Sequence, residues 1–505
     1  MLASLAFAVS AWVVMPTAAA SASSFNVHEY EPAPLSGSEL ELGLAEAIAL
    51  ALRRNTQLQS AYLDRVVDQL NLAVAEAQFR PRGTIVLGAQ QNRAPGDDTD
   101  TQRSSTLSPS LDTELPTGGR IGFSWNLDQD HGLDEPAIQT SRSSQLSLDL
   151  NQPLLRGGGL AVGRAPLEIA RLQETASALG LEETVVGTID SVIAAYRALL
   201  QGQQRLEIAK VSLERTVEQL ERNRALVERG RMAANELVQT ESRLANQRFS
   251  VSQAEDAVDQ SRLELLRLLN LGRDTRLRLR DTVELEALES LRVRSPSLEA
   301  ATSIARDNRP DYLRLRIARE IESIGQMLAE NEHLWRLDLN ASLDAGATGR
   351  SARQATGSTL DERPGYALGL ELEIPILDPE RPVRLLESRI RLQQSEIQFS
   401  EREVELELEV ERSLNDLNSR WQQLGLAQRS LELARESLEI ERERLAVGRT
   451  TSFQVNATEQ NLQQAEQSLL DAVIAYLNAQ TALDRALGTT LDSWGLSLPE
   501  AGVMP

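Results

Sequence analysis

The most constraining feature of the sequence is an apolar residue at every seventh position through a long stretch, Val185 to Leu265. A sustained seven-residue apolar repeat is the signature of a coiled coil. The positions fall on an outgoing arm and a return arm: Val185, Val192, Leu199, Leu206, Leu213, Leu220 and Val227, then Leu237, Leu244, Val251, Val258 and Leu265. The stretch is therefore predicted to form a helical hairpin with its turn at Gly230.

The same pattern occurs a second time, with Gly448 at the turn. Its apolar positions are Val410, Leu417, Leu424, Leu431, Leu438 and Leu445, then Val455, Leu462, Leu469, Tyr476 and Leu483. At about 1.5 Å per residue, the outgoing arms Arg164 to Arg229 and Arg384 to Val447 each span roughly 95–100 Å. Arms of that length, with one narrow apolar stripe, need partners along their whole length and cannot belong to a compact globule.

Composition excludes several classes of protein. The chain has 505 residues, only 4% of them aromatic, and a net charge of −22. Nucleic acid is not expected as a partner, because phosphate binding needs a positive surface; the acidic balance is typical of solvated helix faces. The sequence has no cysteine, so disulfides, thiolate metal sites and a lipidated cysteine are excluded.

The N-terminal residues predict a signal peptide. Leu2 to Ala20 is an apolar run that ends in small residues, and cleavage is expected near Ala20 or Ala22. A positively charged segment is missing before the run, and a membrane anchor is the competing interpretation. The expected organisation is a signal peptide at 1–22, a linker at 23–40, one repeat at 41–290, a second at 291–488 and a tail at 489–505.

Each hairpin follows a shorter helix and a pair of strands. Helical periodicity covers Leu42 to Gln78 and Leu298 to Glu332. Strict apolar and polar alternation predicts four strands: Thr84 to Gln90, Gln145 to Gln152, Leu337 to Ala345 and Tyr366 to Ile374. The polar stretches between them, such as 94–100 and 348–363, are predicted to be loops. A long arm matches two shorter helices laid end to end, so it is expected to pack beside such a pair.

The first repeat carries an additional segment. Thr106 to Leu115 and Arg120 to Leu127 also alternate, and Pro116 to Gly119 is a turn sequence. The segment is either a third and fourth strand or an elaborated loop. The fold class is mixed and mainly α, with two structural repeats of long coiled-coil hairpins and β-strands.

The strands of one chain, four or six, cannot close a barrel, because even the smallest membrane barrels use about eight. An open edge inside a membrane would leave backbone groups without partners. Either the strands form a soluble sheet, or several copies share one barrel; a trimer would have twelve strands, or eighteen with the additional segment. The signal peptide, the apolar strand face and the helices that need partners favour the shared barrel.

The sequence resembles the TolC family of outer-membrane efflux and export channels. The resemblance rests on the two-repeat layout, on Asn151 to Leu155 and Glu373 to Leu377 before the long helices, and on the two hairpin turns. It implies a homotrimer with a β-barrel in the lipid of the outer membrane and a helical tunnel in the periplasm. It also implies that the hairpin tips dock a periplasmic adaptor, which connects to an inner-membrane pump in an efflux or type I secretion system.

The resemblance places the adaptor-docking residues at the hairpin tips: Arg229, Gly230, Arg231, Val447, Gly448, Arg449 and Thr450. Glycine after a helix also has a structural role, since it adopts the left-handed conformation easily. The family turn usually has an apolar or small residue after Val-Gly and an Asp-Val pair further on. Here Arg449 and Gln454 depart from that pattern, so the adaptor surface is expected to be more polar or acidic, a hypothesis that charge reversal at Arg231 and Arg449 would test.

The periplasmic entrance is expected at Glu236, Gln239 and Gln454. The family narrows its entrance with acidic residues after the second turn, where this chain has Gln454 and Ala457. Glu236 is therefore the candidate for an acidic ring, or for a tether to an arginine of the neighbouring hairpin. The alternative is an ordinary solvated glutamate.

No enzyme constellation is evident. His28, His131 and His333 are scattered, and neither a glycine-rich phosphate loop nor a histidine metal pair occurs. We therefore predict no catalytic residues, no bound metal and no cofactor. The alternative function is a secreted or periplasmic coiled-coil scaffold without channel activity, for which the strands beside Pro153 and Pro375 would have no use. The sequence does not choose between drugs, metal ions, proteins and polysaccharides as cargo.

Overall fold

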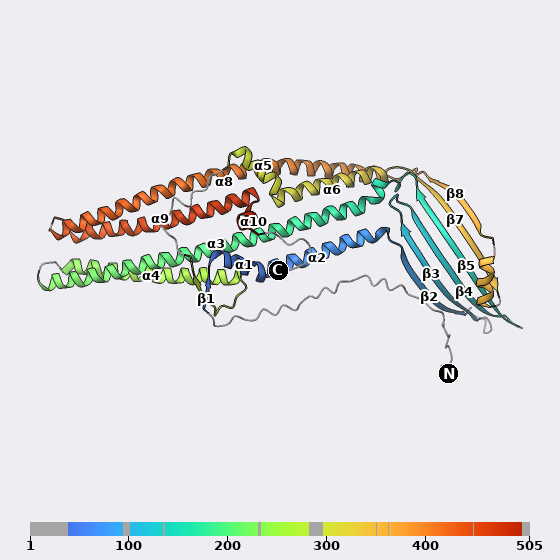
Figure 1. Cartoon of the computed structure of the whole chain (residues 1–505), viewed down its shortest axis with the longest axis horizontal. Coiled ribbons are helices and arrows are strands. Elements are labelled where there is room, and N and C mark those ends of the chain that lie inside the picture. Colours follow the sequence, from blue (N-terminus) through green and yellow to red (C-terminus); the bar gives the residue numbers. More distant parts are fainter. Residues whose placement is uncertain are drawn as a thin grey trace, which may run out of the picture.

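The computed structural model describes residues 39–93, 101–134, 137–230, 234–281, 296–349, 351–361, 363–447 and 449–496. The signal peptide expected at 1–22 lies outside these ranges, as does the predicted loop at 94–100. The molecule is elongated, with long helices filling most of its length and a β-sheet at one end (Figure 1).

Both predicted helical hairpins are confirmed. The first consists of α3 (Leu160–Glu228) and α4 (Ala234–Leu268), and the second of α8 (Glu380–Ala446) and α9 (Ser452–Leu487). The outgoing helices contain 69 and 67 residues, so each is about 100 Å long at about 1.5 Å per residue. Both turns lie at the end of the molecule away from the sheet (Figure 1).

The two shorter helical stretches are each broken, contrary to the prediction of one continuous helix in each repeat. The first divides into α1 (Leu44–Arg54) and α2 (Thr56–Glu76), and the second into α5 (Leu298–Asn308) and α6 (Pro310–Glu332). At the first break Asn55 is extended, and its side-chain oxygen accepts from the backbone N–H groups of Gln57 and Leu58, an N-cap that restarts the helix.

The second break has a different cause. Pro310 occupies the first helical position of α6, where its missing N–H costs nothing, and the residue before a proline disfavours helical geometry. The extended Arg309 is buried and binds Asp311 at 2.8 Å and Glu409 of α8 at 2.5 Å. Burial acts to raise the pKa of Asp311, but Arg309 and Arg402 outweigh it and hold that pKa at about 2. The break is thus fixed to α8 by ion pairs.

Each long helix packs beside shorter helices laid end to end, as predicted. Helix α3 contacts α4 over its half near the tip, and α1 and α2 over its half near the sheet; α8 likewise contacts α9, then α5 and α6. The repeats meet where α3 contacts α6 and α9. Apolar side chains form one cluster in each repeat, centred on Ile189 and Tyr196 of α3 and on Leu406 and Val410 of α8. Among the described residues, no helix is long and apolar enough to cross a membrane.

The four predicted strands are confirmed, and the additional segment also forms strands. One antiparallel sheet has the order β2-β3-β4-β5-β7-β8. Its strands are β2 (Arg82–Arg93), β3 (Thr101–Glu114), β4 (Arg120–Asp134), β5 (Ala137–Pro153), β7 (Arg336–Gly349) and β8 (Gly365–Glu373). The uncertain segment is therefore the hairpin β3–β4, and β2 and β8 are the two edges of the sheet.

The register sorts apolar and polar side chains onto opposite faces. Phe123 of β4 pairs with Leu111 of β3 and Leu148 of β5, and Leu148 pairs with Leu343 of β7. The residues between them are polar, and Ser124 and Ser147 share a hydrogen bond of 2.7 Å. Because successive side chains of a strand point to opposite faces, one face of the sheet is apolar in the half next to the helices.

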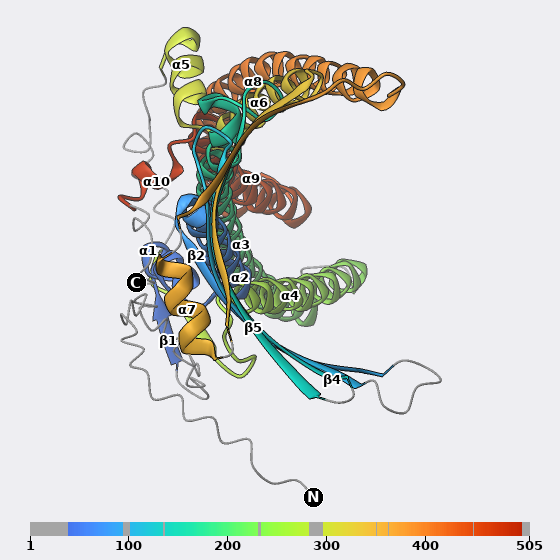
Figure 2. The same cartoon turned by 90° about the vertical axis from the view of Figure 1, so that its right-hand side faces the viewer.

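Several short elements escaped sequence reasoning. Strands β1 (Glu39–Leu42) and β6 (Arg276–Leu279) pair in parallel; η1 (Ala77–Phe79) and α10 (Thr490–Ser493) are single turns. The predicted loop at 348–363 contains α7 (Ala352–Asp361), which packs on β5 and β7. Figure 2 shows α7, β1, α1 and α10 on one side of the curved sheet, while the two hairpins project toward the other.

Candidate functional site

The tip of the first hairpin is a helix end closed by glycine. Arg229 caps α3; its N–H donates to the carbonyl of Ala225, and the Gly230 N–H donates to that of Val227 at 2.9 Å. Gly230 has a φ of +66°, the left-handed conformation that favours glycine. Arg231 lies outside the described residues, so the structure supports the structural role of Gly230 and leaves the docking role of this tip as a prediction.

The tip of the second hairpin is tied back to its own helix. Val447 caps α8, and the Arg449 N–H donates to the carbonyl of Arg444 at 2.8 Å. The Thr450 hydroxyl hydrogen-bonds to Glu441, whose side chain is buried. Thr451 then caps α9 by accepting from the Gln454 N–H. Gly448 lies outside the described residues.

The exposed surface of this tip is apolar as well as basic. Phe453 is 71% exposed and Val447 is 68% exposed, and Arg449 is exposed beside them. Sequence reasoning named Val447 and Arg449 but missed Phe453. A phenylalanine that closely follows the hydroxyl residues of the turn, Thr450 to Ser452, and stands outside the heptad positions was the signal that could have found it.

The entrance residues predicted from the sequence lie near the starts of the two return helices. Gln454 is exposed in the first turn of α9, and Gln239 is exposed in the second turn of α4. Glu236 lies in the first turn of α4, with its side chain outside the described set. Near the tips, Glu459 of α9 is an acidic residue that links the hairpins. It lies 3.0 Å from Arg442 of α8 and 3.8 Å from Arg243 of α4.

This Glu459 bridge is largely shielded from water, since the Glu459 side chain is 14% exposed and that of Arg243 is 18% exposed. Burial lowers the pKa of Arg243, and the charge of Glu459 acts against that lowering. The bridge holds the two return helices together two to three turns from their starts at the tips. A tether between hairpins therefore exists within the chain through Glu459, and the role of Glu236 stays a prediction.

The edge strands of the sheet carry unpartnered apolar side chains. Leu87 of β2 is 77% exposed, and Tyr366 and Leu368 of β8 are 81% and 72% exposed. Each edge strand also leaves one row of backbone N–H and C=O groups without a ladder partner in the described sheet.

Exposed apolar stripes continue from both edges along the adjoining helices. On the β2 side the stripe lies on α2, and on the β8 side it lies on α8. Its members are Leu63, Val67, Leu70 and Val74 of α2, and Val383, Ile390, Ile397, Val404, Leu426, Leu433 and Ile440 of α8. Helix α8 therefore has two apolar stripes, one buried against α9 and one exposed.

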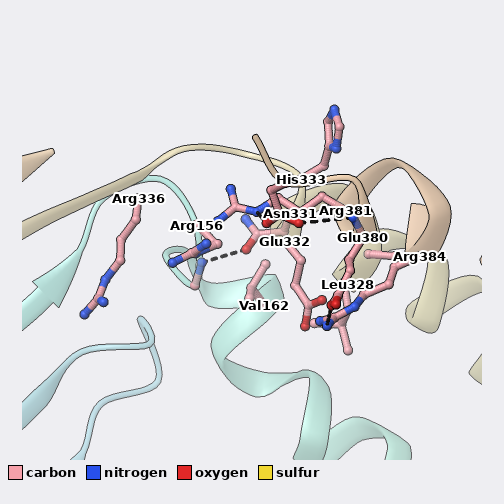
Figure 3. Close-up of a pocket in the computed structure, with 13 residues that line it drawn as sticks. Arg156, Val162, Leu328, Asn331, Glu332, His333, Arg336, Glu380, Arg381 and Arg384 are labelled. Atoms are coloured by element: carbon pink, nitrogen blue, oxygen red, sulfur yellow. Dashed lines mark hydrogen bonds and ion pairs between the residues drawn. The ribbon is translucent and has the colours of Figure 1, made fainter. Parts of the chain in front are cut away.

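A cleft of about 550 Å³ lies where the sheet joins the helices. Figure 3 shows Arg156, Asn331 and Arg381 around it, and the backbone N–H of Gly157 donates to the Asn331 side chain at 2.7 Å. Glu373 at the end of β8 lies 3.6 to 3.8 Å from Arg156, Arg336 and Arg381. Acidic and basic side chains are interleaved here, so the cleft is a joint held by ion pairs.

A model of the outer membrane efflux protein family matches residues 126–271 and 301–489, well over half of the chain. The chain belongs to this family. It is accordingly an outer-membrane channel component of an efflux system, with its helices in the periplasm, and the family is one of transport channels, not an enzyme class. No curated protein sequence matches the chain.

Solved structures support the fold. The chain is similar to CusC, with 17% identity and a TM-score of 0.66 over 88% of this chain and 92% of that one. It is also similar to the outer-membrane channel OprN (18% identity, TM-score 0.63, 88% of this chain and 90% of that one). The outer membrane protein VceC of Vibrio cholerae gives 15% identity and a TM-score of 0.65, over 88% of this chain and 96% of VceC.

Family membership favours the channel over the alternative of a coiled-coil scaffold. It also identifies the setting of the apolar sheet face: a sheet in the outer membrane presents apolar side chains to lipid. The predicted TolC-family relationship and the outer-membrane location are thereby confirmed.

Proposed function

We propose that three copies of the chain close one barrel and one helical tunnel, and that the tunnel receives substrates from a periplasmic adaptor and an inner-membrane pump. The observation that carries this proposal is that two kinds of incompletely buried surface lie in the same places. The open sheet edges and the exposed apolar helix stripes lie at the same two sides of the protomer.

The strand directions suit this closure. In a fully antiparallel sheet of six strands, β2 and β8 run in opposite directions. The β2 edge of one copy therefore meets the β8 edge of the next as an antiparallel pair. Closure satisfies every backbone group within the membrane, which an open sheet cannot do.

The helices would close in the same sense. Helix α2 runs toward the sheet and ends at Glu76, while α8 begins at Glu380 and runs away from it. Val67 of one copy and Ile390 of the next then lie at similar distances from the sheet, and both are exposed within a single protomer. Burying such side chains contributes roughly 1.5–3 kcal/mol each.

Disulfide trapping tests the trimer. The chain has no cysteine, so V67C combined with I390C introduces one pair that can form only between copies. Oxidised membranes should give a covalent trimer on a denaturing gel. In the matched control, V67C with L433C, the second cysteine lies on the same exposed stripe of α8 but far nearer the tip. It is out of reach of residue 67, so this variant should stay monomeric. A monomer in the first variant, with both cysteines accessible to a maleimide, would overturn the trimer.

For adaptor docking the proposal rests on the second tip, where Phe453, Val447 and Arg449 are exposed together. An apolar side chain beside a guanidinium fits a partner with an apolar contact and an acidic rim. Arg229, Gly230, Arg231, Gly448 and Thr450 complete the proposed docking surface, and Gln239, Gln454 and Glu236 the entrance.

Copurification of the adaptor from native membranes tests the docking surface. F453A and R449E should each reduce the recovered adaptor at least tenfold while leaving the amount of trimer unchanged. R429E, on an exposed arginine of α8 remote from the tip, is the matched control and should bind normally. Normal recovery with both tip variants would contradict docking at this tip.

A further inference from the structure

The extra hairpin β3–β4 gives the two repeats unequal shares of the sheet. Four strands, β2 to β5, precede the first long helix, and only β7 and β8 precede the second. The match to the family model begins at residue 126, inside β4, so β3 lies outside it. Two arrangements are to be distinguished: the hairpin is part of the barrel wall, or it is an extension beyond the outer end of the barrel.

The contacts of its turn place the hairpin in the wall. The Thr117 carbonyl accepts from the Gly159 N–H at 3.1 Å, and the Thr117 hydroxyl donates to Gln152 at 2.7 Å. A Cβ added at Gly163, in the first turn of α3, would lie 2.3 Å from the Pro116 carbonyl oxygen. The hairpin therefore runs the full height of the sheet and docks on the start of α3.

The hairpin also keeps the two faces of the sheet in phase. Leu111 of β3 faces Phe123 of β4 and Gly83 of β2, and Phe123 faces Leu148 of β5. Two strands inserted in this register leave the apolar face unbroken, as a lipid-facing wall requires.

We infer that the β3–β4 hairpin is a structural part of the barrel and sets its width, so that the exit is as wide as the helical tunnel. This inference rests on the proposed trimer. Three copies of the six-stranded sheet supply eighteen strands. At about 4.8 Å between strands and a tilt of roughly 40°, they close a cylinder about 36 Å across its backbone.

The helical layer next to the sheet has a similar size. Helices α2, α3, α6 and α8 lie side by side in that order, since α3 contacts α2 and α6, and α8 contacts α6. Three sets of these four helices, spaced about 9–10 Å apart, form a ring about 35–39 Å across. Without the hairpin, twelve strands at the same tilt would close at only about 24 Å. The hairpin thus widens the barrel to match the helical layer at the joint.

Deletion of residues 101–134 tests this inference. It removes both strands and leaves β2 able to pair antiparallel with β5, with apolar residues still on one face. Electron cryomicroscopy of the purified trimer should show the barrel narrowing from about 36 Å to about 24 Å. Polymers added from the outside should be excluded at a correspondingly smaller size. Deletion of α7, residues 352–361, is the matched control, because it shortens a connection without removing a strand.

The outcomes separate the two proposals. Failure of the full-length V67C and I390C pair to form trimers would overturn the proposed assembly. Trimers of the full chain with a barrel near 24 Å, or a deletion trimer of unchanged width, would overturn only the inference about the hairpin. If the deletion variant does not fold, the barrel width of the full chain still decides.

Discussion

The two helical hairpins share their length, turn position and heptad spacing, yet they bury different side chains. In the second hairpin the buried positions between α8 and α9 are mostly leucine. In the tip half of the first hairpin they are mostly polar: Ser212, Thr216, Asn223, Thr240 and Gln247 are all buried. The predicted heptad residues Leu213, Leu237 and Leu244 are only partly buried there.

The difference teaches that one repeat pattern supports two kinds of seam. Asn223 donates to Thr240 across the first hairpin at 2.9 Å, and Gln247 donates to the carbonyl of Ala209 at 3.2 Å. A hydrogen bond contributes a net of about 1 kcal/mol and demands correct geometry, whereas each buried leucine contributes about 1.5–3 kcal/mol. We therefore expect the tip of the first hairpin to open more easily than that of the second.

The largest effect is expected from Leu424→Ala in the second hairpin. Leu424 is 2% exposed, and truncation of a buried leucine costs about 2–5 kcal/mol. Thr216→Ala is the matched change in the first hairpin, where the hydroxyl bonds within its own helix, and it should cost less than about 1 kcal/mol. Chemical denaturation of the trimer and local amide exchange would measure both. Equal losses would break the comparison.

A smaller effect is expected from Asn223→Ala in the first hairpin. The side chain donates to Thr240 and accepts from Gln219, and the loss of both bonds should cost about 1–2 kcal/mol. Amide exchange should rise across the tip halves of α3 and α4 and stay unchanged in α8 and α9. Arg222→Ala, on the adjacent exposed position, serves as the control. Faster exchange in the second hairpin as well would show that the two seams do not open independently.

Acidity should act on the junction where the hairpins meet. The carboxylate of Asp190 in α3 is buried 3.5 Å from Arg485 of α9, and its oxygens accept no hydrogen bond from the described chain. Burial raises the pKa of Asp190 to about 6, with Arg485 opposing and Asp484 adding to the rise. The folded protein therefore binds a proton that the unfolded chain, with a pKa of about 3.9, releases between pH 4 and 6.

It follows that this carboxylate destabilises the fold above pH 6 and ceases to do so as the pH falls toward 4. Asp190→Asn should be more stable than the native chain by about 1–2 kcal/mol at pH 7, and the advantage should vanish near pH 4. Denaturant unfolding of both proteins at the two pH values measures the difference. An advantage that does not depend on pH would contradict the assignment.

The smallest effect is expected from two glycine substitutions. Gly230 has a positive φ and open space around it, so Gly230→Ala should destabilise the first tip by about 1 kcal/mol. Gly425 lies inside α8, also with open space, and Gly425→Ala should stabilise that helix by about 0.5–1 kcal/mol. Thermal unfolding would show opposite shifts. A stabilising alanine at 230 would mean that the turn does not need its left-handed residue.

Sequence reasoning recovered what depends on local periodicity. The heptads from Val410 to Leu483 match the buried seam, because leucine at those positions is removed from water only by packing between α8 and α9. The polar seam of the first hairpin was missed, because Thr216 and Asn223 look like surface residues until a partner such as Thr240 faces them. Parallel pairing of β1 with β6 joins segments far apart in the chain, and no local pattern encodes it.

At the tips, the glycine of the turn was predicted from the sequence, since it depends on residues a few positions away. The Glu459 bridge was not, because Arg243 and Arg442 approach it from two other helices. The strand hairpin β3–β4 was left open because its alternation alone cannot distinguish a wall strand from a long loop; the close approach of Pro116 to Gly163 supplies that distinction.

Strand direction has a consequence for how such exits can diversify. Neighbouring strands of the sheet alternate in direction. A single added strand would make the two edge strands of a copy run in the same direction, so adjacent copies could no longer pair antiparallel. The chain would also leave the sheet at the end opposite the periplasm. Only whole hairpins can be gained or lost, and threefold symmetry multiplies each one. The diameter of the exit therefore changes in steps of six strands. One duplication of a short segment changes this diameter abruptly, whereas a series of point mutations cannot change the number of strands.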